Sequence, residues 1–278
     1  MWRSNRAAHL RWRWRVARAN AADHRGTPFQ FDHAIAGPLV YHPSDYLSRR
    51  LYLYDDFERR ELRYAVDRAR DGGLILDVGA NIGLYTAACA RAAGSAGRVI
   101  ALEPGAATFE KLTGTCRRLQ LTNVTPLRRA ASRTAGAAHL VAPRPDREVQ
   151  QRLVSEGEEG GEPVQTCRLD DVCGDEAAAV TLLKIDVEGH EVAALEGAEG
   201  VLANGRAHLI VEFYGAGLAA SQSSSEALWA LLDRTHRCIA VIASDGTELP
   251  PARAAVETTG PEEMRNTLWV PRRGPARW

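Results

Sequence analysis

A glycine-bearing turn is the first segment of the sequence whose residues could hold a ligand. The residues LILDVGANIGLYT, 74–86, predict a buried strand that runs into Asp77, then a tight turn, then a helix. Glycine lets the backbone approach a ligand closely, and a helix start offers free N–H groups. The spacing is G-x-x-x-G, so neither the pyrophosphate turn G-x-G-x-x-G nor a Walker A loop is present. The residues expected to bind the ligand here are Gly79, Ala80, Asn81 and Gly83.

A carboxylate at the end of the next predicted strand narrows the ligand class. Glu103 ends the segment VIALEP and follows Gly79 by 24 residues. An acid at this point can accept hydrogen bonds from both hydroxyls of a ribose, which NAD and S-adenosylmethionine share. The glycine spacing separates the two, because it lacks the turn that a diphosphate needs. A ligand with a ribose and no diphosphate therefore fits best, and the Asp77 carboxylate would suit its ammonium group.

The elements that must position these residues follow an α/β pattern from Gly72 onward, which predicts a mostly parallel sheet. Strands are expected at 74–78, 99–102, 124–127, 182–187, 209–214, 238–242 and 268–270. Helices are expected at about 83–93, 107–120, 190–202 and 225–236. Residues 143–163 contain SEGEEGGEP and little apolar material, so we expect a surface loop there.

The segments before residue 72 are harder to interpret. Residues 1–37 are expected to form a basic extension, and 38–71 a lead-in to the domain that continues to residue 278. The first 20 residues carry six arginines, three tryptophans and no acid. Their alternation favours a strand, although the arginines at 11, 15 and 18 would also share a helix face. The functional interpretation is a surface for an anionic partner or a membrane interface, and the structural one is an extension that packs or stays mobile. In the lead-in, Tyr54, Asp55 and Glu58 are candidates for a lid.

Together the segments described so far resemble the class I S-adenosylmethionine-dependent methyltransferases. Three further stretches make the resemblance specific to the FkbM family of methyltransferases: TCRLDDV at 166–172, LLKIDVEGHEVAALEGA at 182–198 and HLIVEFY at 208–214. The resemblance covers about residues 38–271. It implies a Rossmann-like, seven-stranded α/β sheet with helices on both faces and S-adenosylmethionine as the cofactor. It also implies that a hydroxyl of a small molecule or glycan is the usual acceptor, with O-methylation as the reaction.

Methyl transfer to a hydroxyl benefits from a general base at the carboxyl ends of the strands. Asp186, at the end of LLKID, is the first candidate, and Glu188, His190 and Glu212 are further catalytic candidates. Each also has a structural interpretation: Glu188 can favour a helix N-terminus, His190 can orient or cap, and Glu212 can be a satisfied buried polar group. Asp170 and Asp171 are candidates for helix capping.

A divalent metal is the less favoured cofactor. Oxygen ligands suit Mg²⁺, and Asp186 with Glu212 would make a partial set, but the sequence indicates no third ligand. There is also no H-E-x-x-H motif, because EGHEVAAL holds a single histidine. We therefore expect no metal site.

Composition excludes several broad classes. The 35 Lys and Arg balance the 35 Asp and Glu, which argues against a basic nucleic-acid-binding coat and against an acidic disordered chain. With 45% hydrophobic residues and no apolar run long enough for a bilayer, a globular protein without a transmembrane segment is expected. Five scattered cysteines indicate free thiols in a reducing, cytoplasmic compartment. The arginine, alanine and glycine bias is typical of a GC-rich, bacterial genome.

Three alternatives stay open beside the O-methyltransferase. An RNA methyltransferase is supported by the basic, tryptophan-rich N-terminus and opposed by the neutral chain and by the absence of a D/N-P-P-Y/F element. A degenerate module could bind S-adenosylmethionine without catalysis. An NAD oxidoreductase is weakest, because its pyrophosphate turn is missing. The sequence predicts neither the acceptor nor the oligomeric state.

Overall fold

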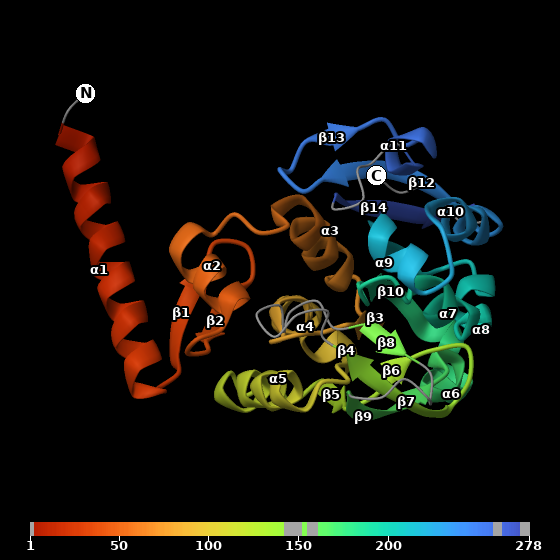
Figure 1. Ribbon diagram of the computed structural model, residues 1–278, viewed down its shortest axis with the longest axis horizontal. Helices are drawn as coiled ribbons and strands as arrows, with labels where there is room; N and C mark the ends of the chain where they lie inside the picture. Colours follow the sequence, from red (N-terminus) through yellow and green to blue (C-terminus); the bar gives the residue numbers. More distant parts are fainter. Residues whose placement is uncertain (1–2, 142–151, 155–160, 258–262, 273–278) are drawn as a thin grey trace.

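The computed structural model describes residues 3–141, 152–154, 161–257 and 263–272, and its centre is one eight-stranded sheet (Figure 1). The strand order is β13-β12-β14-β11-β10-β3-β4-β5. Their bounds are β3 Gly73–Val78, β4 Gly97–Leu102, β5 Val124–Leu127, β10 Val180–Ile185, β11 His208–Tyr214, β12 His236–Ala243, β13 Glu248–Leu249 and β14 Met264–Pro271. Only β14 and the short edge strand β13 run against the others. All the strands that we expected are present in this sheet, and β13 is its one additional strand.

The strand order creates a switch point beside β3. The chain proceeds from β3 outward to β4 and β5, and β10 then pairs with the other side of β3. Open parallel sheets bind ligands at the carboxyl ends of the strands at such a point. The polar residues that end β3, β4 and β10 are therefore brought to one edge of the sheet.

Helices cover both faces of the sheet, because its central strands are apolar on both sides. Ile75 packs with α3, α4 and α5, whereas its neighbour Leu76 packs on the opposite face with α7, α8 and α10. The bounds are α3 Arg59–Ala69, α4 Leu84–Ala93, α5 Ala106–Arg118, α7 Glu191–Glu196, α8 Glu199–Ala203 and α10 Ser225–Asp233. The single helix expected at 190–202 is thus two helices. They meet at Gly197, where a Cβ would lie 2.1 Å from the Ser132 carbonyl oxygen.

A second, four-stranded sheet lies beside the first in the order β6-β9-β7-β8. Its strands are β6 Ala130–Ala131, β7 Gly136–Val141, β8 Arg152–Val154 and β9 Glu162–Cys167. The surface loop expected at 143–163 is therefore wrong for Arg152–Val154 and for the start of β9. Leu153 packs against a small apolar cluster that includes Leu140 and Val164, which explains why this stretch pairs with β7. The rest of that expected loop lies outside the described residues.

The N-terminal segment forms a long helix and a hairpin at one side of the molecule (Figure 1). These elements are α1 Arg3–Arg25, β1 Phe29–His33, β2 Gly37–Tyr41 and α2 Tyr46–Tyr54. The strand favoured for the first 20 residues is wrong, because α1 buries Ala19 and Ala22 against Tyr41 and Tyr52 at helical spacing. The expected boundary at residue 37 falls inside the hairpin of β1 and β2.

The remaining short elements are η1 Gly94–Ala96, α6 Leu169–Cys173, η2 Gly174–Ala179, α9 Gly215–Ala220 and α11 Ala254–Glu257. All five cysteines are buried and unpaired. Within the described ranges, no helix combines the length and the apolar character needed to cross a bilayer.

Candidate active site

A cavity of about 1150 Å³ opens at the carboxyl ends of β3, β4 and β10. Its sheet side consists of the residues that follow these strands, together with Glu212 of β11 and Asn266 of β14. The segment from Ser44 to Arg63, which includes α2 and the start of α3, forms the opposite side. The switch point of the sheet therefore holds a cavity large enough for a nucleoside and a small acceptor.

The glycine turn contributes backbone to this cavity. Gly79, Ala80 and Asn81 line it, and the N–H groups of Gly79 and Ala80 donate to the Leu102 carbonyl at 3.0 and 2.9 Å. Gly79 has a φ of +76°, and a Cβ there would lie 1.8 Å from the Asp186 carbonyl oxygen. Glycine is thus required at this position by the close contact between two strand ends.

Gly83 has a different role from the one expected. It does not line the cavity. It is the residue just before α4, and its φ is +93°. A Cβ on Gly83 would lie 3.0 Å from a Leu112 methyl group, so this glycine allows α4 and α5 to pack closely. The second glycine of the turn therefore positions the helix and does not reach the ligand space.

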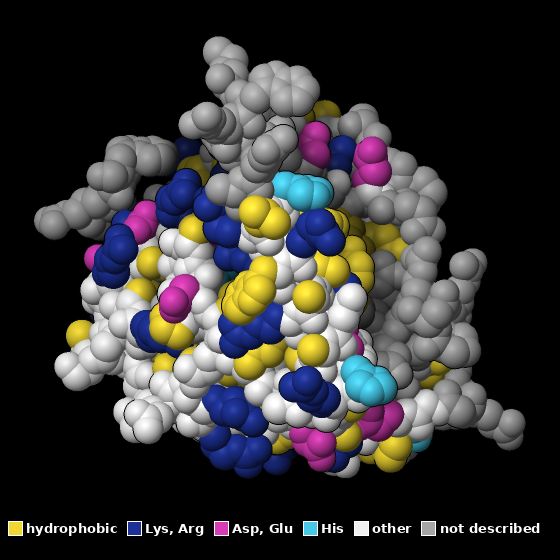
Figure 2. Space-filling model, turned by 90° about the vertical axis from the view of Figure 1, so that its left-hand side faces the viewer, with side chains coloured by type: hydrophobic (Ala, Val, Ile, Leu, Met, Phe, Trp, Pro, Cys, Tyr) yellow, Lys and Arg dark blue, Asp and Glu magenta, His cyan; other side chains and the backbone are white. Residues whose placement is uncertain are grey.

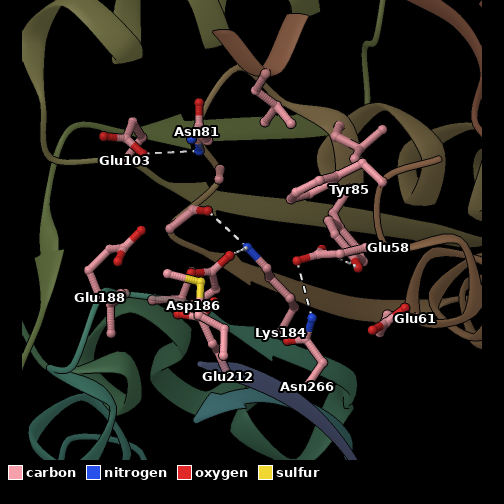
Figure 3. A pocket seen from close by; sticks show the side chains of 18 of the residues that line it. Glu58, Glu61, Asn81, Tyr85, Glu103, Lys184, Asp186, Glu188, Glu212 and Asn266 are labelled. Carbon is pink, nitrogen blue, oxygen red and sulfur yellow. Dashed lines mark hydrogen bonds and ion pairs between the residues drawn. The ribbon is translucent and has the colours of Figure 1, made fainter. Parts of the chain in front are cut away.

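Glu103 is held at the cavity by backbone donors (Figure 3). Its Oε2 accepts from the Asn81 N–H and its Oε1 from the Gly105 N–H, each at 3.0 Å. Burial raises the pKa of Glu103 to about 7, although these two N–H groups lower it. Each carboxylate oxygen keeps a second lone pair for a ligand hydroxyl. These acceptor oxygens therefore fit the hydroxyl groups of a ribose.

Asp77 is buried and does not line the cavity. The side chain is only 1% exposed, and the Thr86 hydroxyl donates to its Oδ2. Its Oδ1 is 4.0 Å from the Lys184 ammonium nitrogen. The expected direct contact between Asp77 and a ligand ammonium is therefore not supported by its place in the structure, because Lys184 occupies the position next to it.

Lys184 is the site residue that the sequence did not reveal. Its ammonium group donates to the Gly79 carbonyl at 3.0 Å and to Asp186 Oδ2 at 3.1 Å (Figure 3). Burial alone would lower its pKa, but the charges of Asp186, Asp77 and Glu58 raise the pKa above its usual value. A lysine in a buried strand, two residues before an acid on the same face, was the available signal. Lys184 ties the glycine turn to the end of β10.

The expected catalytic carboxylates gather around Lys184. Asp186, Glu188 and Glu212 all line the cavity. Burial, followed by the charge of Asp186, raises the pKa of Glu188 to about 9 and that of Glu212 well above its usual value. Glu188 Oε2 and Glu212 Oε2 are buried without a hydrogen-bond partner among the described residues. At neutral pH the Glu188 side chain is therefore mostly protonated, whereas Asp186 is paired with an ammonium.

Of the three lid candidates, only Glu58 reaches the cavity. Tyr54 is exposed, and Asp55 pairs with His33 at 2.6 Å. Glu58 accepts from the Tyr85 hydroxyl at 2.8 Å and from the Asn266 amide at 3.1 Å (Figure 3). Burial, then the charge of Asp186, raises its pKa to about 7.

The residues after Glu188 mainly shape the turn. His190 lines the cavity with its Nε2 3.2 Å from the Ser132 hydroxyl, and burial lowers its pKa to about 4. Glu191 accepts from the Val187 and Gly189 N–H groups and so holds the turn closed.

Farther away, Asp170 accepts from the N–H groups of Gly200 and Val201, which makes it a cap of α8.

No group of three His, Cys, Asp or Glu with metal-binding geometry occurs among the residues that the structure describes. Within the same ranges, no residue before Ser44 lines the cavity. The basic N-terminal helix thus contributes nothing to its described wall, and the observation that would favour an RNA substrate is missing.

The family of the chain follows from a match that spans the whole site. The Methyltransferase FkbM domain family matches residues 77–238, more than half of the chain, from the end of β3 into β12. The chain belongs to the FkbM methyltransferase family. It is therefore an S-adenosylmethionine-dependent methyltransferase, and the α/β fold with helices on both faces that the sequence predicted is confirmed.

Several individual proteins are similar to the chain. The hexuronic acid methyltransferase AglP of Haloferax volcanii is 30% identical over 179 residues, which are 61% of this FkbM chain and 72% of that protein. The crystal structure of methyltransferase FkbM from Methylobacillus flagellatus KT is 19% identical with a TM-score of 0.46, over 81% of this chain and 55% of that one. Aeropyrum pernix fibrillarin in complex with S-adenosyl-L-methionine is 13% identical with a TM-score of 0.42, over 72% and 68% of the chains.

Proposed function

We propose that this FkbM methyltransferase methylates a hydroxyl group of a sugar or of another small, polar acceptor. The observation that supports it best is that one cavity holds both Glu103, a carboxylate fixed by backbone N–H groups, and the Lys184–Asp186 pair. The relative AglP is a hexuronic acid methyltransferase, which supports a sugar acceptor. The five unpaired thiols fit a reducing compartment, and we include a cytoplasmic location in the proposal.

The cofactor end of the cavity is formed by Glu103 and by the backbone from Gly79 to Asn81. Glu103 would accept hydrogen bonds from the two ribose hydroxyls, since its oxygens are fixed by backbone donors and retain acceptor capacity. When bound, S-adenosylmethionine supplies an electrophilic methyl group, so that transfer to a hydroxyl forms an ether and releases one proton.

Asp186 is the residue that we assign to take up this proton. It lies at the cavity, and Lys184 fixes its carboxylate from 3.1 Å. The raised pKa of Glu188, about 9, keeps its proton at neutral pH, so Glu188 acts as a hydrogen-bond donor that orients the acceptor, and burial also favours the neutral form of Glu212. Because the methyl donor is intrinsically reactive, much of the rate comes from placing the acceptor oxygen in line with the transferred carbon.

Two arginines at the cavity favour an anionic sugar. Arg63 of α3 and Arg129, which follows β5, both line the cavity and are exposed. Neither forms an ion pair with another described residue, unlike Arg50 and Arg60, which pair with Asp56 and Glu248. A guanidinium binds a carboxylate through two parallel hydrogen bonds, so either arginine could select a uronic acid over a neutral sugar.

The first test is calorimetric binding of S-adenosylhomocysteine, which needs no acceptor. We expect one-site binding by the wild type and a loss of at least about a hundredfold in Glu103→Ala, because two charge-assisted hydrogen bonds contribute about 1.5–3 kcal/mol each. Asp171→Ala, which removes an exposed carboxylate outside the cavity, is the matched control. Absence of binding by the folded wild type would contradict the proposed site.

The second test is turnover with glucuronic, galacturonic and neutral hexose acceptors, followed as S-adenosylhomocysteine release. Asp186→Asn should keep cofactor binding and lose about 10²–10⁴-fold in turnover, the usual contribution of a general base. Binding without turnover on any acceptor would favour the degenerate module, and turnover retained by Asp186→Asn would contradict the assigned base.

A further inference from the structure

The outward face of α1 carries an apolar stripe whose two large side chains, Leu10 and Trp14, are exposed. Leu10, Trp14, Ala17 and Ala21 recur at the spacing of one helix face. Leu10 is 63% exposed and Trp14 61%, whereas the opposite face of the helix buries Ala19 and Ala22 against the hairpin and α2. The helix therefore has two opposed apolar stripes, of which only one is used for folding.

Arginines flank the outward stripe on both sides. By helical spacing, Arg11 and Arg18 lie along one edge and Arg13 along the other. Arg11 and Arg13 form no ion pair with any described residue, and Arg18 places its guanidinium over the rings of Trp14 and Phe29 at 5.4 and 3.9 Å. The side of the molecule that carries α1 shows dark blue cationic side chains around yellow apolar ones (Figure 2).

The charge on α1 is uncompensated along most of its length. Its sequence has one acid, Asp23, near the C-terminal end. Asp23 is already engaged, because it accepts from the Tyr41 hydroxyl, the Ser44 N–H and the Arg49 guanidinium, each at 2.8 Å. The exposed half of the helix therefore carries a net positive charge that attracts an anionic partner.

Among anionic partners, a lipid surface fits both features of the face. A duplex or single strand of RNA would pair with the arginines, but it would leave Leu10 and the alanines without an apolar partner. A second copy of α1 would cover the apolar stripe but would bring arginines against arginines, with no carboxylate on either face. A membrane interface offers phosphates to the guanidinium groups and an acyl boundary to tryptophan and leucine.

We propose that α1 binds the surface of an anionic lipid membrane, with Leu10 and Trp14 at the boundary of the acyl region and Arg11, Arg13 and Arg18 on the headgroups. The opposite stripe of α1 packs on α2, and α2 residues line the cavity. Binding through α1 therefore holds the whole enzyme, cavity included, at the membrane surface. This inference does not depend on the proposed acceptor.

The experiment is flotation of the full-length protein with phosphatidylcholine vesicles and with mixed phosphatidylcholine–phosphatidylglycerol vesicles. We expect binding to the mixed vesicles only, weakened by salt. Arg11→Gln/Arg13→Gln should weaken it roughly 25-fold, at about fivefold per arginine near the surface. Arg206→Gln/Arg234→Gln removes two exposed charges outside α1 and should leave binding unchanged.

Leu10→Ser/Trp14→Ser separates the membrane from the other partners, because it keeps every charge. Loss of flotation in this variant, with thermal unfolding as in the wild type, supports membrane binding. Absence of wild-type flotation overturns the proposal, and so does flotation that survives both α1 variants. RNA binding that depends on the arginines and not on Leu10 and Trp14, without flotation, also overturns it and identifies α1 as a nucleic-acid surface.

Discussion

Replacing Lys184 by methionine should destabilise the fold strongly, because this residue is the cation nearest the buried carboxylates of the site. Its ammonium nitrogen is 3.1 Å from Asp186 Oδ2, 4.0 Å from Asp77 Oδ1 and 3.0 Å from the Gly79 carbonyl oxygen. Methionine keeps the length and the apolar packing of the side chain but removes the charge and the donors. Asp77, which is 1% exposed, then loses its compensating charge.

Removing one partner of a buried ion pair costs about 3–5 kcal/mol, since the other charge stays buried. In a chain of this size, 1 kcal/mol corresponds to about 2–4 °C, so the melting temperature should fall by about 6–20 °C. The loss should be smaller at lower pH. Without Lys184 the pKa values of Asp77 and Glu58, already raised by burial, rise further, so the folded variant takes up protons that the unfolded chain does not bind.

Urea unfolding at pH 8.5 and pH 6.5 measures both effects. Lys111→Met is the matched control, because Lys111 is the other lysine of the chain and forms a 2.8 Å pair with Asp45 at a side chain that is 29% exposed. The control should lose less than about 1 kcal/mol. The reasoning is refuted if Lys184→Met loses no more than this control, or if its deficit relative to the wild type is the same at both pH values.

Three further predictions concern the turn, a helix cap and the acids. Gly79→Ala should prevent stable folding, because its Cβ would overlap a carbonyl oxygen at 1.8 Å. The control Gly246→Ala, at a similar φ of +83° but with open space around the Cβ, should cost only about 1–2 kcal/mol of stability. Thermal unfolding of the two variants compares these costs. Asp170→Ala should lose about 0.5–2 kcal/mol in urea unfolding through the two N–H groups that it caps, and Asp171→Ala almost nothing. Wild-type stability should rise as pH falls from 9 to 7, because the pKa of Glu188 is about 9 when folded, and a flat profile would contradict this.

The candidate site residues that lie at the cavity were recognisable from local signals. Apolar runs marked the ends of β3, β4 and β10, and polar residues that follow these strands, Asn81, Glu103 and Asp186, line the cavity. The positions of strand ends are encoded within a few residues of each strand. The edge of the sheet at which they meet then follows from the parallel α/β pattern.

The positions that the sequence did not predict depend on which strands are neighbours. Asp77 of β3 and Lys184 of β10 stand directly opposite each other in the register, so their side chains share a face. That pairing requires β10 to return beside β3, and no local pattern encodes it. Asp77 therefore looked like a ligand residue in the sequence, whereas in the folded chain it compensates the charge of a buried lysine.

Glu58 shows how a strained connection can complete a site from a distant part of the chain. Asp55 caps the C-terminus of α2 and Glu58 precedes α3, and both residues adopt left-handed conformations, with φ of 54° and 46°. Such conformations cost about 1–3 kcal/mol in a residue other than glycine and persist only where other contacts compensate. Here the hydroxyl of Tyr85 and the amide of Asn266, 27 and 208 residues away, hold the Glu58 carboxylate at the cavity. The lead-in is therefore part of the active-site wall, and its hydrogen bonds to α4 and β14 make the shape of the acceptor end depend on the whole sheet.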